Sequence, residues 1–269
     1  MGSVVSYCIK TRIESAAFPA PKKGYTSSHK NFRFIVAPES QKIACMFYEF
    51  KKSKSVLIYS HGNATDIGYM HKFISNLSRD CAINIISYDY EGYGLTPGIP
   101  SENGCIKAIT CVYNYLINEG YSPNNIILYG TSIGTGPTVD LAEKISNKNK
   151  KLKGVLLQTP YTSVVGVVSK IPEVSSSYVC SSVSMENPNI FRSSEKISKI
   201  TSPIVIVHGI KDELISYSHA VSLYQSNKLA SLVTLENATH NNIENDYYEV
   251  IVKCIKNMLN NVTTLSQIS

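Results

Sequence analysis

The sequence lacks long apolar runs. Its apolar runs are short, for example residues 56–59 and 204–207, whereas a membrane-spanning helix needs about 18 consecutive apolar residues. Near the start the one apolar feature is the pair Val4-Val5, which is shorter than the apolar core of a signal peptide, so we expect no secretory signal peptide. The chain of 269 residues is nevertheless 43% hydrophobic and only 17% charged. This composition supports a large buried core and excludes a mostly disordered protein.

Metal and nucleotide signatures are also missing. The seven cysteines are scattered, with no C-x-x-C pair and no zinc-like spacing of Cys and His. The sequence contains no H-E-x-x-H or G-x-x-x-x-G-K-[ST] motif, and residues 134–136 lack the rest of a dinucleotide fingerprint. No nucleic-acid-binding motif accompanies the basic residues. We therefore expect no metal, no cofactor and no nucleic acid, and reduced, mostly buried thiols.

The excess of positive over negative charge is confined to one end of the chain. The net charge is +6, yet residues 1–54 hold ten Lys and Arg against three Asp and Glu, whereas the other residues hold 16 against 17. A basic end on a neutral body is typical of proteins that meet an anionic membrane surface or nucleic acid. The alternative is a solvated basic face without a partner.

Short apolar segments alternate with amphipathic ones after residue 30. This pattern predicts a mostly parallel sheet with helices on both faces, an α/β fold. The expected strands are 32–36, 43–50, 56–60, 83–89, 126–129, 155–158, 204–207 and 232–236, the first two forming a possible hairpin; the expected helices are 66–79, 102–119, one ending near 146, and 243–259. We divide the chain into an N-terminal arm (1–30), one domain (31–262) and a tail (263–269). A serine-rich insertion around 160–200 interrupts the alternation like a lid.

The strongest motif is G-x-S-x-G at residues 130–134, between an apolar strand and a helix. At such a junction a serine occupies a tight turn, and its hydroxyl projects above the carboxyl edge of the sheet. Ser132 is therefore the candidate nucleophile. A serine hydroxyl needs a base to activate it and an acid to orient that base.

Candidates for the acid and the base follow two later strands. In this fold class the order is Ser, then Asp, then His, and Asp212 and His240 fit that order in the loops HGIKDELI and ENATHNNIE. Glu213 and Asp89 are weaker alternatives for the acid. Of the other histidines, His208 is interpreted as a packing or hydrogen-bonding residue, and His219 is placed on the surface of the next helix.

The loop at residues 61–64, His-Gly-Asn-Ala, ends an earlier strand. Hydrolases of this class stabilise the oxyanion with two backbone N–H groups, one after the nucleophile and one from this earlier loop. We assign them to Ile133 and Asn63, with Ala64 as the alternative to Asn63. Asn63 and Asn237 are also N-glycosylation sequons beside the site, where glycans would block it, which favours a cytosolic protein.

Taken in order, several motifs resemble one known family. They are HGNATD, YDYEGYG followed by PGIPSE, YGTSIGTGPTVDLA, EKISKITSPIVIVHGIKDELI and THNNIE. The chain from about residue 18 to its last helix resembles the ABHD17 group, serine hydrolases of the α/β-hydrolase fold related to the Bem46 proteins. Two departures are Thr239, where the family usually has glycine, and a long serine-rich segment at about 172–194.

The resemblance implies a fold and an activity. Proteins of this group act as depalmitoylases, thioesterases that remove long acyl chains from cysteines of membrane-attached proteins. The implied partners are thus S-palmitoylated proteins, and the implied triad falls on Ser132, Asp212 and His240. The alternatives are a lysophospholipase or carboxylesterase that cleaves lipid oxygen esters, and a membrane-anchored scaffold without turnover. The oligomeric state is left open.

The first residues fit a lipidation signal. Residues 1–6 match M-G-x-x-x-[ST], which predicts myristate on Gly2. One myristate binds membranes only marginally, so palmitate on Cys8 or a basic patch would be the second signal. The cations of that patch are Lys10, Arg12, Lys22, Lys23 and Lys30. We expect a lipid-anchored peripheral protein on the cytoplasmic face of a membrane; without lipidation it would be a soluble cytosolic esterase.

Overall fold

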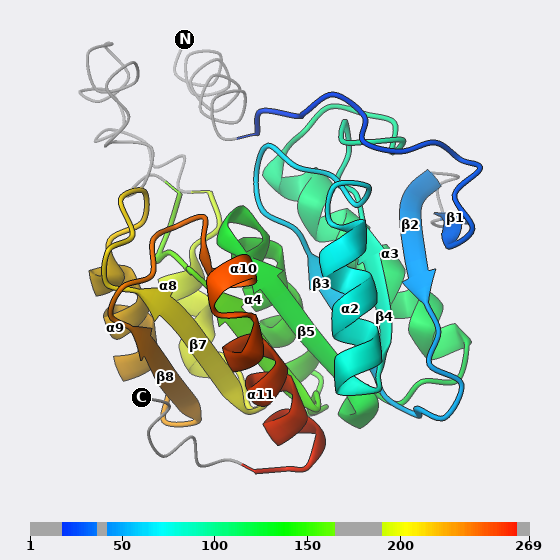
Figure 1. Cartoon of the computed structure of the whole chain (residues 1–269). Helices are drawn as coiled ribbons and strands as arrows, with labels where there is room; N and C mark the ends of the chain where they lie inside the picture. Colours follow the sequence, from blue (N-terminus) through cyan, green and yellow to red (C-terminus); the bar gives the residue numbers. More distant parts are fainter. Residues whose placement is uncertain (1–17, 37–41, 165–189, 263–269) are drawn as a thin grey trace, which may run out of the picture.

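The computed structural model describes residues 18–36, 42–164 and 190–262. They build one eight-stranded sheet with the order β1-β2-β4-β3-β5-β6-β7-β8 (Figure 1). The strands are β1 (Phe32–Val36), β2 (Lys42–Tyr48), β3 (Val56–Ser60), β4 (Asn84–Tyr88), β5 (Ile126–Thr131), β6 (Gly154–Gln158), β7 (Ile204–Gly209) and β8 (Ala230–Leu235). Each predicted strand is present, with bounds that differ by a few residues at most.

Strand direction agrees with the predicted parallel sheet. β2 pairs antiparallel with both β1 and β4, and the pairs from β4 to β8 are all parallel. β3, β4, β5 and β6 are buried along their whole length. This burial explains why their sequences are continuously apolar rather than alternating.

Helices cover both faces of the sheet. Helices α2 (His71–Cys81) and α11 (Tyr248–Leu259) pack on the face that carries Leu57 and Tyr59, in front of the sheet in Figure 1. Helices α3 (Glu102–Asn118), α4 (Thr135–Ser146) and α9 (Tyr217–Gln225) pack on the opposite face. The short elements are η1 (Pro123–Asn125), η2 (Ser132–Gly134), α8 (Ser193–Lys196), η3 (Ile197–Lys199) and α10 (Ile243–Asp246).

Two helices differ from the prediction. The helix expected from residue 66 begins at His71, because the Asp66 carboxylate accepts the N–H groups of Gly68 and Tyr69 and holds that stretch as a turn. The helix expected over 243–259 is divided into α10 and α11 at Tyr247.

The expected arm of residues 1–30 needs a correction. From Phe18 onward the chain lies against the domain: Phe18 is buried, and its ring contacts Phe191 edge to face at 6.3 Å. Tyr25 donates a hydrogen bond to Asp89. Residues 18–30 therefore belong to the domain, whereas residues 1–17 and the expected tail, residues 263–269, lie outside the described residues.

The expected lid-like insertion is described at its two ends. Val164 N–H donates to the Ile190 carbonyl over 3.0 Å, so the segments that enter and leave residues 165–189 lie side by side. Residues 190–200 return to the sheet through α8 and η3. The serine-rich part between these ends lies outside the described residues.

The described cysteines match the expectation of reduced, buried thiols. The five described cysteines, Cys45, Cys81, Cys105, Cys111 and Cys254, are free and buried. Within the described ranges no helix has the length and apolar character needed to cross a membrane.

Candidate active site

Ser132 lies at the turn between β5 and η2, where the prediction places the nucleophile. Its φ is +52°, in the left-handed region that side chains other than glycine rarely adopt. The flanking glycines are required by close contacts. A Cβ on Gly130 would lie 2.5 Å from the Gly134 carbonyl oxygen, and one on Gly134 would lie 2.3 Å from the Ser60 carbonyl oxygen. The turn thus presents a partly exposed Ser132 above the sheet.

Three predicted residues meet at the carboxyl ends of β5, β7 and β8. His240 Nε2 lies 3.1 Å from Ser132 Oγ, and His240 Nδ1 lies 2.8 Å from Asp212 Oδ2. The side chain of Asp212 is buried, and that of His240 is 9% exposed. A hydroxyl, an imidazole and a carboxylate in this sequence of contacts can activate the hydroxyl as a nucleophile.

Asp212 is held by more than His240. Its Oδ1 accepts the N–H groups of Leu214 and Ile215 at 2.9 and 2.7 Å, and His208 Nε2 lies 3.2 Å from Oδ2. Burial raises the pKa of Asp212. The hydrogen bonds from His208, His240 and Ile215, together with the charge of His240, outweigh burial and hold the pKa far below its usual range. The carboxylate is therefore ionised and fixed in orientation.

The structure separates the alternative residues from this group. Glu213 is exposed, and its Oε2 accepts the backbone N–H of His240, not the imidazole, at 3.3 Å. Asp89 is buried beside His61, at 3.3 Å. His219 lies on α9 with its Nδ1 2.9 Å from Thr162 Oγ1. His208 is a hydrogen-bonding residue, as predicted, and supports Asp212.

The loop at residues 61–64 lies beside the serine. A Cβ on Gly62 would be only 3.8 Å from Ser132 Cβ. The Asn63 side chain accepts a hydrogen bond from Tyr93 at 2.7 Å, and Ala64 has a φ of +53°. Ile133 follows Ser132, and its carbonyl accepts the Tyr161 hydroxyl at 2.9 Å. The two segments chosen for oxyanion binding thus flank Ser132, and both Asn63 and Ala64 stay candidates for the second donor.

Glu244 is a residue that the sequence reasoning missed. Its Oε1 accepts the Tyr59 hydroxyl at 3.0 Å, and that hydroxyl lies 3.4 Å from Thr131 Oγ1, next to the serine. Burial raises the pKa of Glu244. The hydrogen bonds from Tyr59 and Thr131 and the charge of His240 offset this rise only in part. The feature of the sequence that could have revealed Glu244 is its position in the THNNIE motif, four residues after His240.

The remaining predicted positions are the two lipidation sites. Gly2 and Cys8 lie outside the described residues. Within the described part of the chain, no three His, Cys, Asp or Glu side chains gather in a way that could hold a metal ion.

Curated proteins with related sequences include alpha/beta hydrolase domain-containing proteins 17B and 17C. The chain is 37% identical to mouse alpha/beta hydrolase domain-containing protein 17C over 214 residues, which are 78% of this chain and 62% of that protein. It is 38% identical to human alpha/beta hydrolase domain-containing protein 17B over 209 residues, 77% of this chain and 67% of that protein. The chain thus spans less than two thirds of the 17C protein's length. No protein-family model matches the sequence.

Solved structures share the architecture at low sequence identity. The esterase Pf2001 of Pyrococcus furiosus superimposes with a TM-score of 0.71 at 15% identity, covering 92% of this chain and 99% of that one. Mouse alpha/beta hydrolase domain-containing protein 10 gives a TM-score of 0.63 at 15% identity, covering 86% and 99%. The chain has the α/β-hydrolase fold and belongs to the family of alpha/beta hydrolase domain-containing protein 17, as its motifs indicate.

Proposed function

We propose that this α/β hydrolase is a serine hydrolase that cleaves acyl thioesters, with palmitate on cysteines of membrane-attached proteins as its substrate. The observation that carries the proposal is the chain of contacts from Ser132 Oγ through His240 to Asp212, at 3.1 and 2.8 Å. The resemblance of the motifs to a depalmitoylase family favours the thioester.

The first half of the reaction forms an acyl-enzyme. His240 Nε2 takes the proton from Ser132 Oγ as that oxygen bonds to the thioester carbonyl carbon. Asp212 orients the imidazole and stabilises its charged form. When the tetrahedral intermediate collapses, the carbon–sulfur bond breaks, and the proton on His240 passes to the departing cysteine sulfur.

The second half releases the fatty acid. His240 takes a proton from water, whose oxygen attacks the acyl-serine carbonyl carbon. The bond to Ser132 Oγ then breaks, and Oγ recovers the proton from His240. In both halves the negative oxygen is bound by the backbone N–H of Ile133 and by one from the 61–64 loop, assigned to Asn63. One such donor is typically worth about 3 kcal/mol in the transition state.

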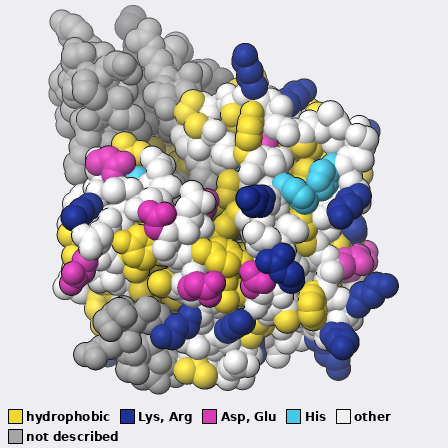
Figure 2. Space-filling model, in the orientation of Figure 1, with side chains coloured by type: hydrophobic (Ala, Val, Ile, Leu, Met, Phe, Trp, Pro, Cys, Tyr) yellow, Lys and Arg dark blue, Asp and Glu magenta, His cyan; other side chains and the backbone are white. Residues whose placement is uncertain are grey.

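The membrane part of the proposal rests on charge and on the N-terminal motif. Lys and Arg side chains gather on the right half of the face in Figure 2. The exposed cations among the described residues up to 54 are Lys22, Lys23, Lys30, Lys42, Lys51, Lys52 and Lys54. We propose that they face an anionic bilayer on its cytoplasmic side, with lipid on Gly2 and Cys8. Intact mass after co-expression with an N-myristoyltransferase tests the anchor, and an unmodified Gly2 contradicts it.

Labelling with a fluorophosphonate tests the serine. We expect labelling of the folded wild type and none of Ser132→Ala at equal folded concentration. Unlabelled wild type would favour the catalytically silent scaffold. Hydrolysis by Ser132→Ala would contradict the assignment of the triad. In a labelled protein, kcat/KM for a palmitoylated peptide is then compared with that for the matched palmitate oxygen ester. A higher value for the thioester is expected, whereas preference for the ester would assign a lipase or carboxylesterase.

A further inference from the structure

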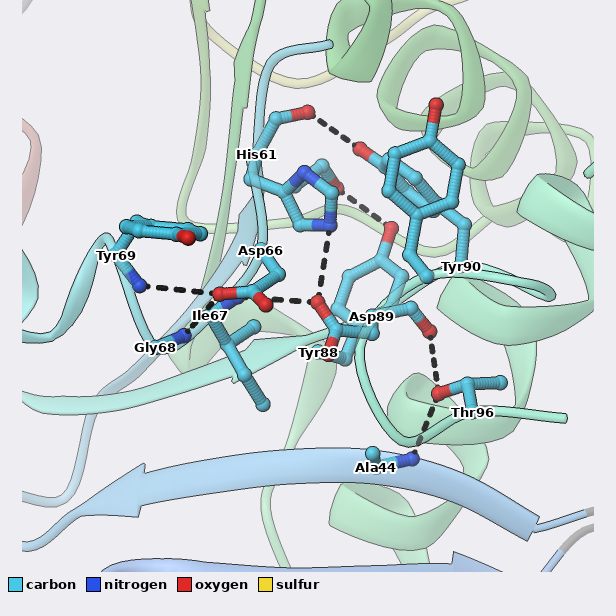
Figure 3. Close-up of polar contacts among 12 residues, drawn as sticks. Ala44, His61, Asp66, Ile67, Gly68, Tyr69, Tyr88, Asp89, Tyr90 and Thr96 are labelled. Carbon is cyan, nitrogen blue, oxygen red and sulfur yellow. Dashed lines mark hydrogen bonds and ion pairs between the residues drawn. The ribbon is translucent and has the colours of Figure 1, made fainter. Parts of the chain in front are cut away.

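Two buried carboxylates, Asp66 and Asp89, connect the N-terminal segment to the loops around Ser132. Figure 3 shows both carboxylates with His61 and the turn at residues 67–69. Asp66 and Asp89 are both fully buried, and neither touches the three residues of the triad. Each carboxylate binds residues 24–25 on one side and the turn at residues 67–69 on the other. That turn follows directly on the 61–64 loop.

Asp66 fixes the backbone of the N-terminal segment. Its Oδ2 accepts the Gly24 N–H at 2.6 Å, while its Oδ1 accepts Gly68 N–H at 2.8 Å and Tyr69 N–H at 3.1 Å. The two backbones touch, because a Cβ on Gly68 would lie 2.7 Å from the Gly24 carbonyl carbon. Gly24 and Gly68 thus permit a contact that other residues would prevent.

Asp89 connects the same segment to His61. Its Oδ1 accepts the Ile67 N–H at 3.0 Å and lies 3.3 Å from His61 Nε2. Its Oδ2 accepts the hydroxyl of Tyr25, which in turn accepts the Leu95 N–H at 3.1 Å. Burial and the charge of Asp89 raise the pKa of Tyr25, so the hydroxyl keeps its proton and donates it to the carboxylate.

His61 begins the loop assigned to oxyanion binding. Its Nδ1 lies 2.7 Å from the Gly62 carbonyl oxygen, and its own carbonyl accepts the Tyr90 hydroxyl at 2.7 Å. The imidazole ring is therefore bound to its own loop at one nitrogen and faces Asp89 at the other. One buried ring thus links Asp89 to the loop beside Ser132.

We propose that Tyr25 is a positioning residue for catalysis: through Asp89 and His61 it fixes the 61–64 loop that binds the oxyanion. The proposal rests on the proposed function. Without the Tyr25 hydroxyl, Asp89 loses its donor on Oδ2, and a buried carboxylate with fewer donors rearranges its surroundings. The N-terminal segment, which contributes nothing to the triad, then becomes a part of the catalytic machinery.

The test is the substitution Tyr25→Phe in the full chain, which removes one oxygen and keeps the ring. With 4-nitrophenyl butyrate as substrate we expect kcat to fall about tenfold to about a hundredfold, with KM within about twofold of wild type. Affinity for a trifluoromethyl ketone, whose adduct with Ser132 places an oxyanion in the same site, should weaken by the same factor. Tyr224→Phe, at an exposed position of α9, is the matched control and should leave all three values unchanged.

A purely structural role of Tyr25 would lower the melting temperature and leave kcat of the folded protein intact. Normal kcat in folded Tyr25→Phe, or a change in KM alone, would overturn the proposal. Should Tyr25→Phe fail to fold, Asp89→Asn, which keeps the size of the side chain that accepts the Tyr25 hydroxyl and faces His61, takes its place. A lowered kcat of that variant supports the proposal and a normal kcat overturns it. A wild type that fluorophosphonate does not label would refute the proposed function itself and this proposal with it.

Discussion

His208 Nε2 lies 3.2 Å from Asp212 Oδ2, the same oxygen that His240 Nδ1 faces at 2.8 Å. His208 Nε2 also lies 3.0 Å from the Ile215 carbonyl oxygen. Because a carbonyl and a carboxylate only accept hydrogen bonds, this nitrogen must carry a proton. Asp212 therefore has a second imidazole donor, which sets its pKa and its orientation together.

Replacement of His208 should weaken catalysis without touching the triad. In His208→Leu the pKa of Asp212 should rise towards its ordinary value, and His240 should be oriented less well. We expect kcat to fall about tenfold, which corresponds to about 1.4 kcal/mol. His208→Gln, whose amide can still donate, should recover part of the loss in steady-state assays. Equal kcat for His208→Leu and wild type would show that the second donor is dispensable.

The strained backbone at Ser132 should lower the stability of the folded protein, and catalysis requires a serine in that strained conformation. With φ at +52°, a residue with a Cβ is strained there, and glycine is not. Ser132→Gly should therefore be more stable than Ser132→Ala by about 1 kcal/mol. Urea unfolding of the two inactive variants measures the difference. A Ser132→Ala variant as stable as Ser132→Gly would mean that the turn relaxes when the hydroxyl is lost.

Addition of a methyl group should lower the stability strongly at one glycine near the site and hardly at all at another. In Gly134→Ala the new Cβ would lie 2.3 Å from the Ser60 carbonyl oxygen, so we expect a loss of about 2 kcal/mol or more. In Gly62→Ala the nearest atom is 3.8 Å away, an ordinary contact, and stability should change by less than about 0.5 kcal/mol. Thermal melts of both variants decide this; similar melting temperatures would contradict the close packing at Gly134.

Glu244 should make the domain less stable as pH rises. Burial raises its pKa in the folded protein above the unfolded value of about 4.3, so the folded state binds a proton more tightly. Its contribution to stability is present below about pH 4 and is lost as pH rises through the folded pKa. Glu244→Gln, which still accepts from Tyr59, should thus raise the urea midpoint at pH 7 and leave it nearly unchanged at pH 4. The same gain at both pH values would mean that ionisation of Glu244 is not the cause.

The meeting of Ser132, Asp212 and His240 could be predicted because topology fixes it. Ser132, Asp212 and His240 follow strands that were readable from short apolar runs, and parallel strands bring their carboxyl ends to one edge. The mostly parallel direction of the strands follows from the same signal, whereas their order in the sheet does not. Position along the chain was sufficient here, since each side chain needed only to be the right chemical type in the right loop.

Other parts of the site were not readable, because their signals are not periodic. Phe18 and Tyr25 stand in a segment without regular apolar spacing, yet their partners are Phe191 and Asp89, far away in the sequence. The start of α2 was misplaced because an apolar period does not reveal that Asp66 accepts backbone N–H groups. Single long-range side-chain contacts of this kind leave no pattern in neighbouring residues.

The hydrogen bond between Val164 and Ile190 has a consequence for how this hydrolase can diversify. Because Val164 and Ile190 are hydrogen-bonded neighbours, the two ends of the connection between them are fixed side by side whatever its length. The entropic cost of closing a connection rises by only about 0.6 kcal/mol for each doubling of its length. Relatives, or a protein engineer, can therefore change the length of that one connection while the strands keep their register.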